Sequence, residues 1–136
     1  MDAVVSLEVV EHVENPRHFF REIARILKPG GRVFVTTPNQ LSAASKLCLL
    51  TKGQFQWFQD SCYPAHITAL LPIDLVRIAR EVGLEDGAIS YTNNGRIPMT
   101  HRAWQDVTKL FRGRRFSDNV CFAARKPVQG QDGERI

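Results

Sequence analysis

The chain has 136 residues, of which 43% are hydrophobic and 24% are charged, and its formal net charge is +4. This length suits one domain around a single core, and no apolar run approaches the roughly 20 residues that a membrane-spanning helix requires. The three cysteines are Cys48, Cys62 and Cys121, and their odd number and wide spacing argue against a disulfide framework or a zinc knuckle.

The N-terminal residues predict a strand followed by a helix. Ala3 to Leu7 (AVVSL) is short, valine-rich and almost wholly apolar, which is typical of a strand buried on both faces of a parallel sheet. Asn15 and Pro16 predict the start of a helix over 16–28, because asparagine is a good N-cap and proline is tolerated at the first helical position. Residues 1–14 carry acids and lack the basic start of a secretory signal, so we expect a cytoplasmic protein.

A second strand is predicted after a tight turn. Lys28-Pro29-Gly30-Gly31 combines a cation, a helix breaker and two permissive glycines, and this pattern predicts the end of the helix. The run from Arg32 to Thr37 (RVFVTT) is β-branched and aromatic, which predicts a strand. Strand, helix and strand within about 40 residues predict a right-handed βαβ unit with parallel strands. Residues 39–71 form a long connection in which SAASKLCLL predicts a short helix.

The second half of the chain predicts one more helix and two more strands. Apolar residues recur at helical spacing over 72–82. Residues 87–91 (GAISY) and 119–125 (NVCFAAR) predict strands, and a short helix is expected around 104–111 between them. The sequence therefore indicates an α/β protein.

The order of these pieces resembles a known family. Residues 2–39 (DAVVSLEVVEHVENPRHFFREIARILKPGGRVFVTTPN) resemble the fourth strand, the following helix and the fifth strand of class I S-adenosylmethionine-dependent methyltransferases. Residues 66–85 and 117–127 are similar to the next helix and the final strand of that family. The resemblance implies a partial Rossmann-like fold over 1–127, with strands in the order 4-5-7-6 and the last strand antiparallel to its neighbours. Residues 39–71 would be a lid or insertion, and 128–136 are expected to be a disordered tail.

The resemblance lacks the part of the family that holds most of the cofactor. The family places a glycine-rich loop after its first strand and an acidic residue after its second, and neither is found in this sequence. Gly30-Gly31 cannot replace that loop, because it precedes a strand instead of following one and opening a helix. We therefore expect a truncated methyltransferase domain that binds S-adenosylmethionine weakly or not at all and has little or no activity by itself.

The missing strands also predict a partner. In the family's strand order, the strand at 3–7 would become an unguarded edge of the sheet, which is a site for pairing with another chain. The candidate partners are a separately encoded N-terminal half or a second copy. The alternative to an enzyme is a non-catalytic remnant, or a subunit that completes a partner's sheet.

Residues 8–16 (EVVEHVENP) carry the candidate chemistry and allow two interpretations. Acids ahead of a helix are ordinary, because they interact favourably with its macrodipole. If residues 8–12 form one helical turn, however, Glu8 meets Glu11 and His12 on one side. Two carboxylates and an imidazole can bind a divalent cation such as Mg²⁺ or Mn²⁺. A metal hydrolase is a weaker alternative, because E-x-x-E-H is not the H-E-x-x-H pattern.

The resemblance further narrows the roles expected for residues 8–16. O-methyltransferases of the ubiquinone-biosynthesis and small-RNA 3′-end types use an E-x-x-E-H segment and a later histidine. The matching candidate metal ligands are Glu8, Glu11, His12 and His66. Glu11 and His12 are the candidate catalytic bases, and Ser6, Leu7 and Glu8 lie where the family's cofactor rests. The implied reaction is O-methyl transfer to a small-molecule acceptor, and no nucleic-acid partner is expected.

Two further groups of residues have both a functional and a structural interpretation. The aromatic residues Phe55, Trp57, Phe58 and Tyr63 could line an acceptor pocket or simply attach a long loop to the core. The basic residues between Lys109 and Arg115 could attract a phosphate, a nucleic acid or an anionic membrane. They could equally be the solvated end of a helix.

Overall fold

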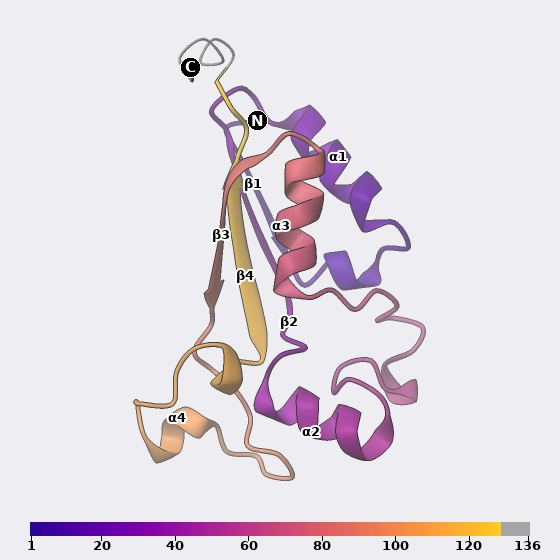
Figure 1. Cartoon of the computed structure of the whole chain (residues 1–136), viewed down its shortest axis with the longest axis vertical. Helices are drawn as coiled ribbons and strands as arrows, with labels where there is room; N and C mark the ends of the chain where they lie inside the picture. The colour runs from indigo at the N-terminus through magenta and orange to yellow at the C-terminus, as the bar shows by residue number, and fades with distance from the viewer. Residues whose placement is uncertain (129–136) are drawn as a thin grey trace.

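The computed structural model describes residues 1–128, and its centre is one four-stranded sheet. The strands are β1 (Ala3–Leu7), β2 (Arg32–Pro38), β3 (Glu85–Tyr91) and β4 (Asn119–Arg125), in the order β1-β2-β4-β3 (Figure 1). β1 and β2 are parallel, whereas β4 is antiparallel to both of its neighbours. The predicted order 4-5-7-6, with an antiparallel last strand, is confirmed.

The two long helices that follow β1 and β2 pack on the same face of the sheet. These are α1 (Pro16–Ile26) and α3 (Pro72–Glu81), which lie side by side in Figure 1. The other elements lie near the strand ends and are α2 (Ala43–Lys52), α4 (Trp104–Val107) and the 3-10 turns η1 (Val10–His12), η2 (Asp60–Cys62) and η3 (Arg114–Phe116). Within residues 1–128, no helix has the length and apolar character needed to cross a membrane.

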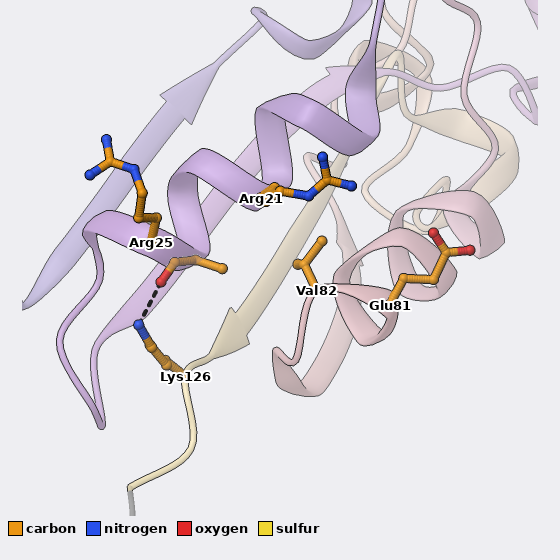
Figure 2. Close-up of a pocket in the computed structure, with 6 residues that line it drawn as sticks. Arg21, Arg25, Glu81, Val82 and Lys126 are labelled. Atoms are coloured by element: carbon orange, nitrogen blue, oxygen red, sulfur yellow. Dashed lines mark hydrogen bonds between the residues drawn. The ribbon is translucent and has the colours of Figure 1, made fainter.

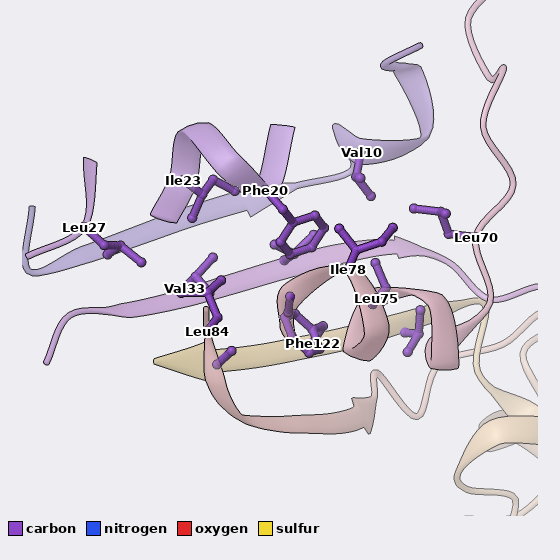
Figure 3. Close-up of a cluster of buried hydrophobic side chains, with 14 residues drawn as sticks. Val10, Phe20, Ile23, Leu27, Val33, Leu70, Leu75, Ile78, Leu84 and Phe122 are labelled. Atoms are coloured by element: carbon purple, nitrogen blue, oxygen red, sulfur yellow. The ribbon is translucent and has the colours of Figure 1, made fainter. Parts of the chain in front are cut away.

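The hydrophobic core fills the space between the sheet and the two long helices (Figure 3). Alternate residues of the central strands face the helices, because successive side chains of a strand point to opposite faces. Phe20 of α1 meets Phe122 of β4 edge to face, with ring centroids 5.9 Å apart. The buried members are Val10, Phe20, Ile23, Leu27, Val33, Val35, Leu70, Leu75, Ile78, Ala79, Leu84, Val120, Phe122 and Ala124.

The prediction that the first strand is buried on both faces is wrong. The side chains of Val5 and Leu7 are 66% and 58% exposed, whereas Ser6 is only 9% exposed. Both long helices cover the face to which Ser6 belongs, and the residues described here leave the other face of β1 open. β1 is also an edge strand of the described sheet, which agrees with the predicted strand order.

The ends of α1 follow from local chemistry. At the start, Asn15 Oδ1 accepts a hydrogen bond from the His18 amide at 2.9 Å, so Asn15 is the predicted N-cap. The helix ends at Ile26 and not at Lys28, because Leu27 is already extended. The Lys126 ammonium donates to the carbonyls of Ala24 and Leu27 at 2.7 and 2.9 Å, in the shallow cavity shown in Figure 2. This cation therefore stabilises the carbonyl end of the helix.

The remaining element predictions hold with small changes of boundary. The short helix predicted within 39–71 is α2, and the helix expected around 104–111 is the four-residue α4. Residues 129–136 of the predicted disordered tail lie outside the described residues.

Candidate functional site

The candidate residues lie where the chain leaves the carboxyl end of β1. Glu8 follows that strand and has a φ of +52°, in the left-handed region that non-glycine residues rarely adopt. The only helical residues before α1 are the three of η1, so residues 8–12 do not form the single helical turn that the spacing argument required. Glu11 and His12 are in this turn, and Glu8 is outside it.

Backbone hydrogen bonds bring the distant segment 65–68 against η1. The amides of Ile67 and Thr68 both donate to the Glu11 carbonyl at 3.0 Å. The Thr68 hydroxyl donates to the Val13 carbonyl at 2.6 Å. As a result, the rings of His12 and His66 meet edge to face with centroids 4.7 Å apart, although 53 residues separate them in the chain.

Both histidine rings are held in the same tautomer by backbone carbonyls. His12 Nδ1 lies 2.6 Å from the Ala65 carbonyl oxygen, and His66 Nδ1 lies 2.6 Å from the Trp57 carbonyl oxygen. Because a carbonyl only accepts hydrogen bonds, each Nδ1 must carry the proton and donate. Each neutral ring then has an unprotonated Nε2, which is how metal-binding histidines are usually oriented.

Glu11 is the buried member of this group. Its side chain is completely inaccessible, and its Oε2 accepts a hydrogen bond from the Thr37 hydroxyl at 3.0 Å. Its Oε1 has no hydrogen-bond partner in the described chain and lies 3.8 Å from His12 Nε2. Burial raises the pKa of the Glu11 carboxyl, and the nearby Glu8 charge acts in the same direction. Single ligand atoms from Glu11, His12 and His66 all lie within 4.8 Å of one another.

Glu8 belongs to a neighbouring group instead. Its Oε2 accepts a hydrogen bond from Asn119 Nδ2 at 2.6 Å, and its Oε1 is buried without a partner within residues 1–128. The structure therefore brings together Glu11, His12 and His66 of the four predicted ligands, and holds Glu8 beside them through β4.

The predicted cofactor residues occupy the end of β1. Ser6 is buried, and its hydroxyl oxygen has no hydrogen-bond partner in the described part of the chain. Leu7 is exposed and ends the strand, and Glu8 directly follows it. The Gly30-Gly31 turn precedes β2 and lies beyond the amino ends of the parallel strands, so it is remote from these residues, as the sequence argument required.

Sequence reasoning missed two partners of the candidate carboxylates. Thr37 binds Glu11, and Asn119 binds Glu8. Their positions in the sequence could have identified them. The predicted β2 ends near Thr37 and the antiparallel β4 begins at Asn119, so both residues lie at the same end of the sheet. Of the aromatic candidates, Phe58 contacts His66 with ring centroids 5.5 Å apart, whereas Tyr63 is 73% exposed.

The donor set fits a divalent cation. Two buried carboxylate oxygens lack hydrogen-bond partners in the described chain, and two imidazoles use Nδ1 for a backbone carbonyl, which leaves Nε2 as the ligand atom of the neutral ring. Mixed oxygen and nitrogen ligands suit Mn²⁺, Fe²⁺ or Zn²⁺, whereas Mg²⁺ prefers oxygen alone. The residues that would hold the cation are Glu11, His12 and His66, with Glu8 adjacent.

Comparison with known sequences finds matches to methyltransferases. The family model described as a methyltransferase domain matches residues 1–88. The ubiquinone biosynthesis O-methyltransferase of Xanthomonas oryzae is 38% identical over 79 residues, an alignment that includes 52% of this chain and 33% of that protein. The matching region therefore spans about a third of that relative.

Comparison with solved structures gives the same fold. A SAM-dependent methyltransferase from Thermotoga maritima matches 92% of this chain with a TM-score of 0.64 at 17% identity, and this chain covers 55% of it. A phosphoethanolamine N-methyltransferase of Haemonchus contortus, in complex with S-adenosyl-L-methionine, matches 93% of this chain with a TM-score of 0.50 at 18% identity. This chain covers 33% of that protein. At these identities the likeness concerns the fold, and it agrees with the predicted partial Rossmann-like architecture.

Proposed function

Because this chain belongs to the methyltransferase domain family, which uses S-adenosylmethionine, we propose that it carries the cation-binding and acceptor-binding part of an O-methyltransferase site. The observation that carries this proposal is the group formed by Glu11, His12 and His66 at the carboxyl end of β1. In open α/β sheets, ligands bind outside the carboxyl ends of the strands. The similarity to ubiquinone biosynthesis O-methyltransferases supports oxygen as the methylated atom.

The proposed reaction is a direct displacement. The acceptor oxygen forms a bond to the methyl carbon of S-adenosylmethionine as the carbon–sulfur bond breaks and the hydroxyl proton leaves. A divalent cation at the site would supply a lower pKa for the acceptor hydroxyl and a fixed position for its oxygen.

The residues of this chain would bind the cation, orient the acceptor and accept the proton. The Ala65 and Trp57 carbonyls accept hydrogen bonds from Nδ1 of the two imidazoles, so the neutral form of each ring has Nε2 available as a ligand or a base. Thr37 orients the Glu11 carboxylate through Oε2 and leaves Oε1 free. Because the pKa of Glu11 is raised, this carboxylate is also a better proton acceptor than an exposed glutamate.

The cofactor would contact only part of its site on this chain. Ser6 and Glu8 offer two buried oxygens without hydrogen-bond partners within residues 1–128, next to the end of β1. Within residues 1–128, no glycine-rich turn follows a strand and opens a helix, so we propose that the chain alone binds S-adenosylmethionine weakly. A melting temperature that rises by several degrees with the cofactor would contradict weak binding.

The edge of β1 is the proposed attachment point for a partner. Beside it lies an apolar groove of about 630 Å³, bordered by Val4 and Ser6 of β1 and by Phe19, Ile23 and Ile26 of α1. We propose that an N-terminal half pairs here, because the relatives that match this chain are longer than it is. Self-pairing of two copies is the competing outcome, and sedimentation velocity of this chain alone separates the two.

Calorimetric titration with Mn²⁺ tests the cation site. Wild type should bind about one ion per chain, and a Glu11→Ala/His12→Ala variant should show no saturable heat. The matched control is Glu14→Ala/His18→Ala, which removes one exposed acid and one exposed histidine from the next stretch of chain. Equal heats in all three proteins, or none in wild type, would end the proposal.

A further inference from the structure

The segment between β3 and β4, residues 92–118, concentrates the positive charge of the molecule. Its six cations less its two acids leave +4, which equals the formal net charge of the whole chain. All six cations are exposed, and none forms an ion pair within the described residues. Both acids are engaged locally, because Asp106 and Asp118 accept hydrogen bonds from the amides of Ala103 and Arg96. The segment thus presents a nearly uncompensated positive field.

The same segment exposes three large apolar side chains. Met99 is fully exposed, Leu110 is 87% exposed and Val107 is 61% exposed. Met99 is in the turn of a hairpin that is closed by the bridge between Arg96 and Ala103. These apolar side chains are interspersed along the segment with its six cations, so apolar and basic groups are exposed in the same stretch of chain.

The segment is an ordered structure with a small core of its own. The rings of Trp104, Phe111 and Phe116 pack on one another with centroids 4.7 to 5.4 Å apart. Gln105 Nε2 donates to the Phe111 and Phe116 carbonyls at 2.6 and 2.9 Å. The exposed aliphatic side chains therefore lie outside a cluster that is already formed.

The segment is also fastened to the domain at one end of the sheet. Asn39, which is completely buried, donates from Nδ2 to the Arg114 and Ser117 carbonyls at 2.7 and 2.8 Å. In Figure 1 the segment lies at the same end of the molecule as α2, below the strands. A surface bound by this segment would consequently approach that end of the domain.

We propose that this segment binds an anionic lipid surface. The residues involved form what we call the basic tip, namely Arg96, Met99, Arg102, Val107, Lys109, Leu110, Arg112, Arg114 and Arg115. Basic residues are attracted to anionic headgroups, and aliphatic side chains between them enter the headgroup boundary. Both kinds of residue are exposed in one short stretch of chain, which is the composition that such binding requires.

A nucleic acid fits the basic tip less well. Proteins that bind single strands stack bases on exposed aromatic rings. Here the rings of Trp104, Phe111 and Phe116 are half-buried and pack on one another, whereas the large apolar side chains that the segment exposes are aliphatic. The proposal does not depend on the activity proposed above.

Co-sedimentation of the full chain with vesicles tests the proposal. We expect binding to vesicles of phosphatidylcholine mixed with phosphatidylglycerol and little binding to phosphatidylcholine alone. The binding should weaken as salt rises, because exposed charges are screened beyond about 8 Å at physiological ionic strength. Equal binding to both kinds of vesicle would overturn the assigned electrostatic attraction.

Matched variants locate the binding surface. Arg112→Gln/Arg114→Gln/Arg115→Gln should lower the partition coefficient between about tenfold and a hundredfold, and Met99→Asp/Leu110→Asp should also lower it. Arg21→Gln/Arg77→Gln/Arg80→Gln removes the same charge from exposed sites on the long helices and should bind like wild type. Equal melting temperatures of the variants exclude unfolding as the cause.

Two results would refute the assignment. In the first, vesicle binding survives both basic-tip variants and is lost in Leu50→Asp, which changes an 85% exposed residue of α2. In the second, the chain binds a single-stranded RNA oligonucleotide through the basic tip and binds no vesicles.

Discussion

Replacing Glu11 with glutamine should make the protein more stable at neutral pH when no divalent cation is present. The Glu11 carboxylate is completely buried, and only its Oε2 has a hydrogen bond, from Thr37. An amide keeps an acceptor for the Thr37 hydroxyl and removes the charge. Its NH₂ group would replace Oε1 on the side of the His12 Nε2 lone pair, which lies 3.8 Å away in the wild type. An unfavourable buried charge is thus replaced by a neutral amide.

The sign of the pH dependence follows from the raised pKa of Glu11. A carboxyl whose pKa is higher in the folded than in the unfolded state stabilises the fold while it is protonated. That contribution is fully present below the ordinary value of 4.5 and is lost as pH rises through the folded-state pKa. The advantage of Glu11→Gln should therefore be small at pH 4 and reach its maximum above that folded-state pKa.

The size of the effect can be bounded from the burial. A buried polar group without a partner costs about 1–3 kcal/mol, and more when it is charged. For a domain of this length, 1 kcal/mol corresponds to roughly 4 °C in melting temperature. Thermal unfolding followed by circular dichroism, at pH 4 and 7.5 with EDTA, should show a gain of about 4–12 °C at the higher pH only.

Mn²⁺ should reverse the order of the two proteins. At a thousand times its dissociation constant, a ligand that binds only the folded state stabilises it by about 4.1 kcal/mol, which exceeds the 1–3 kcal/mol expected from the buried charge. Wild type should gain this stability, and Glu11→Gln, which lacks the anionic ligand, should gain little. If Glu11→Gln is less stable than wild type at pH 7.5 in EDTA, or differs equally at both pH values, the argument from the buried charge is wrong.

Three further predictions concern the core, the anchor of His66 and the open edge. Phe20→Ala should cost about 3–5 kcal/mol of unfolding free energy in denaturant titration, because Phe20 is fully buried against Phe122. Thr68→Val removes the hydrogen bond to the Val13 carbonyl and should weaken Mn²⁺ binding in calorimetry, while Thr92→Val, at an exposed site, should not. Val5→Lys should reduce any self-association seen by sedimentation velocity without lowering the melting temperature, because Val5 is 66% exposed.

The sequence predicted the elements of the fold well and the environment of β1 poorly. Asn15, Pro16 and the Lys28 to Gly31 turn carry local signals, so the helix between them could be placed within two residues. Burial of β1 is not a local property. The same five residues, four of them apolar, are buried or exposed according to which elements cover the sheet, and here both long helices pack on one face.

In the candidate site too, the sequence predicted what depends on neighbouring residues better than what depends on distant ones. Spacing suggested that Glu8 would join Glu11 and His12, but this assumes a helix, and the left-handed backbone at Glu8 turns the chain before η1 begins. His66 could be found only through the family resemblance, since no spacing rule spans a connection of that length. Two amide hydrogen bonds to the Glu11 carbonyl bring it to its place, and these depend on the folded path of residues 39–71.

The combination of Glu11 and the two histidines is costly for folding alone, and this cost is an argument for a ligand. A core that served stability only would place an apolar or amide side chain at position 11, because burial penalises the carboxylate. It would also have no reason to bring two imidazoles next to this carboxylate and fix each through Nδ1, since each bond to a carbonyl orders a half-exposed ring. Binding a divalent cation would turn all three features into favourable interactions at once. The Mn²⁺ titration and the pH dependence of Glu11→Gln therefore examine the same physical claim from its two sides, the gain on binding and the penalty without it.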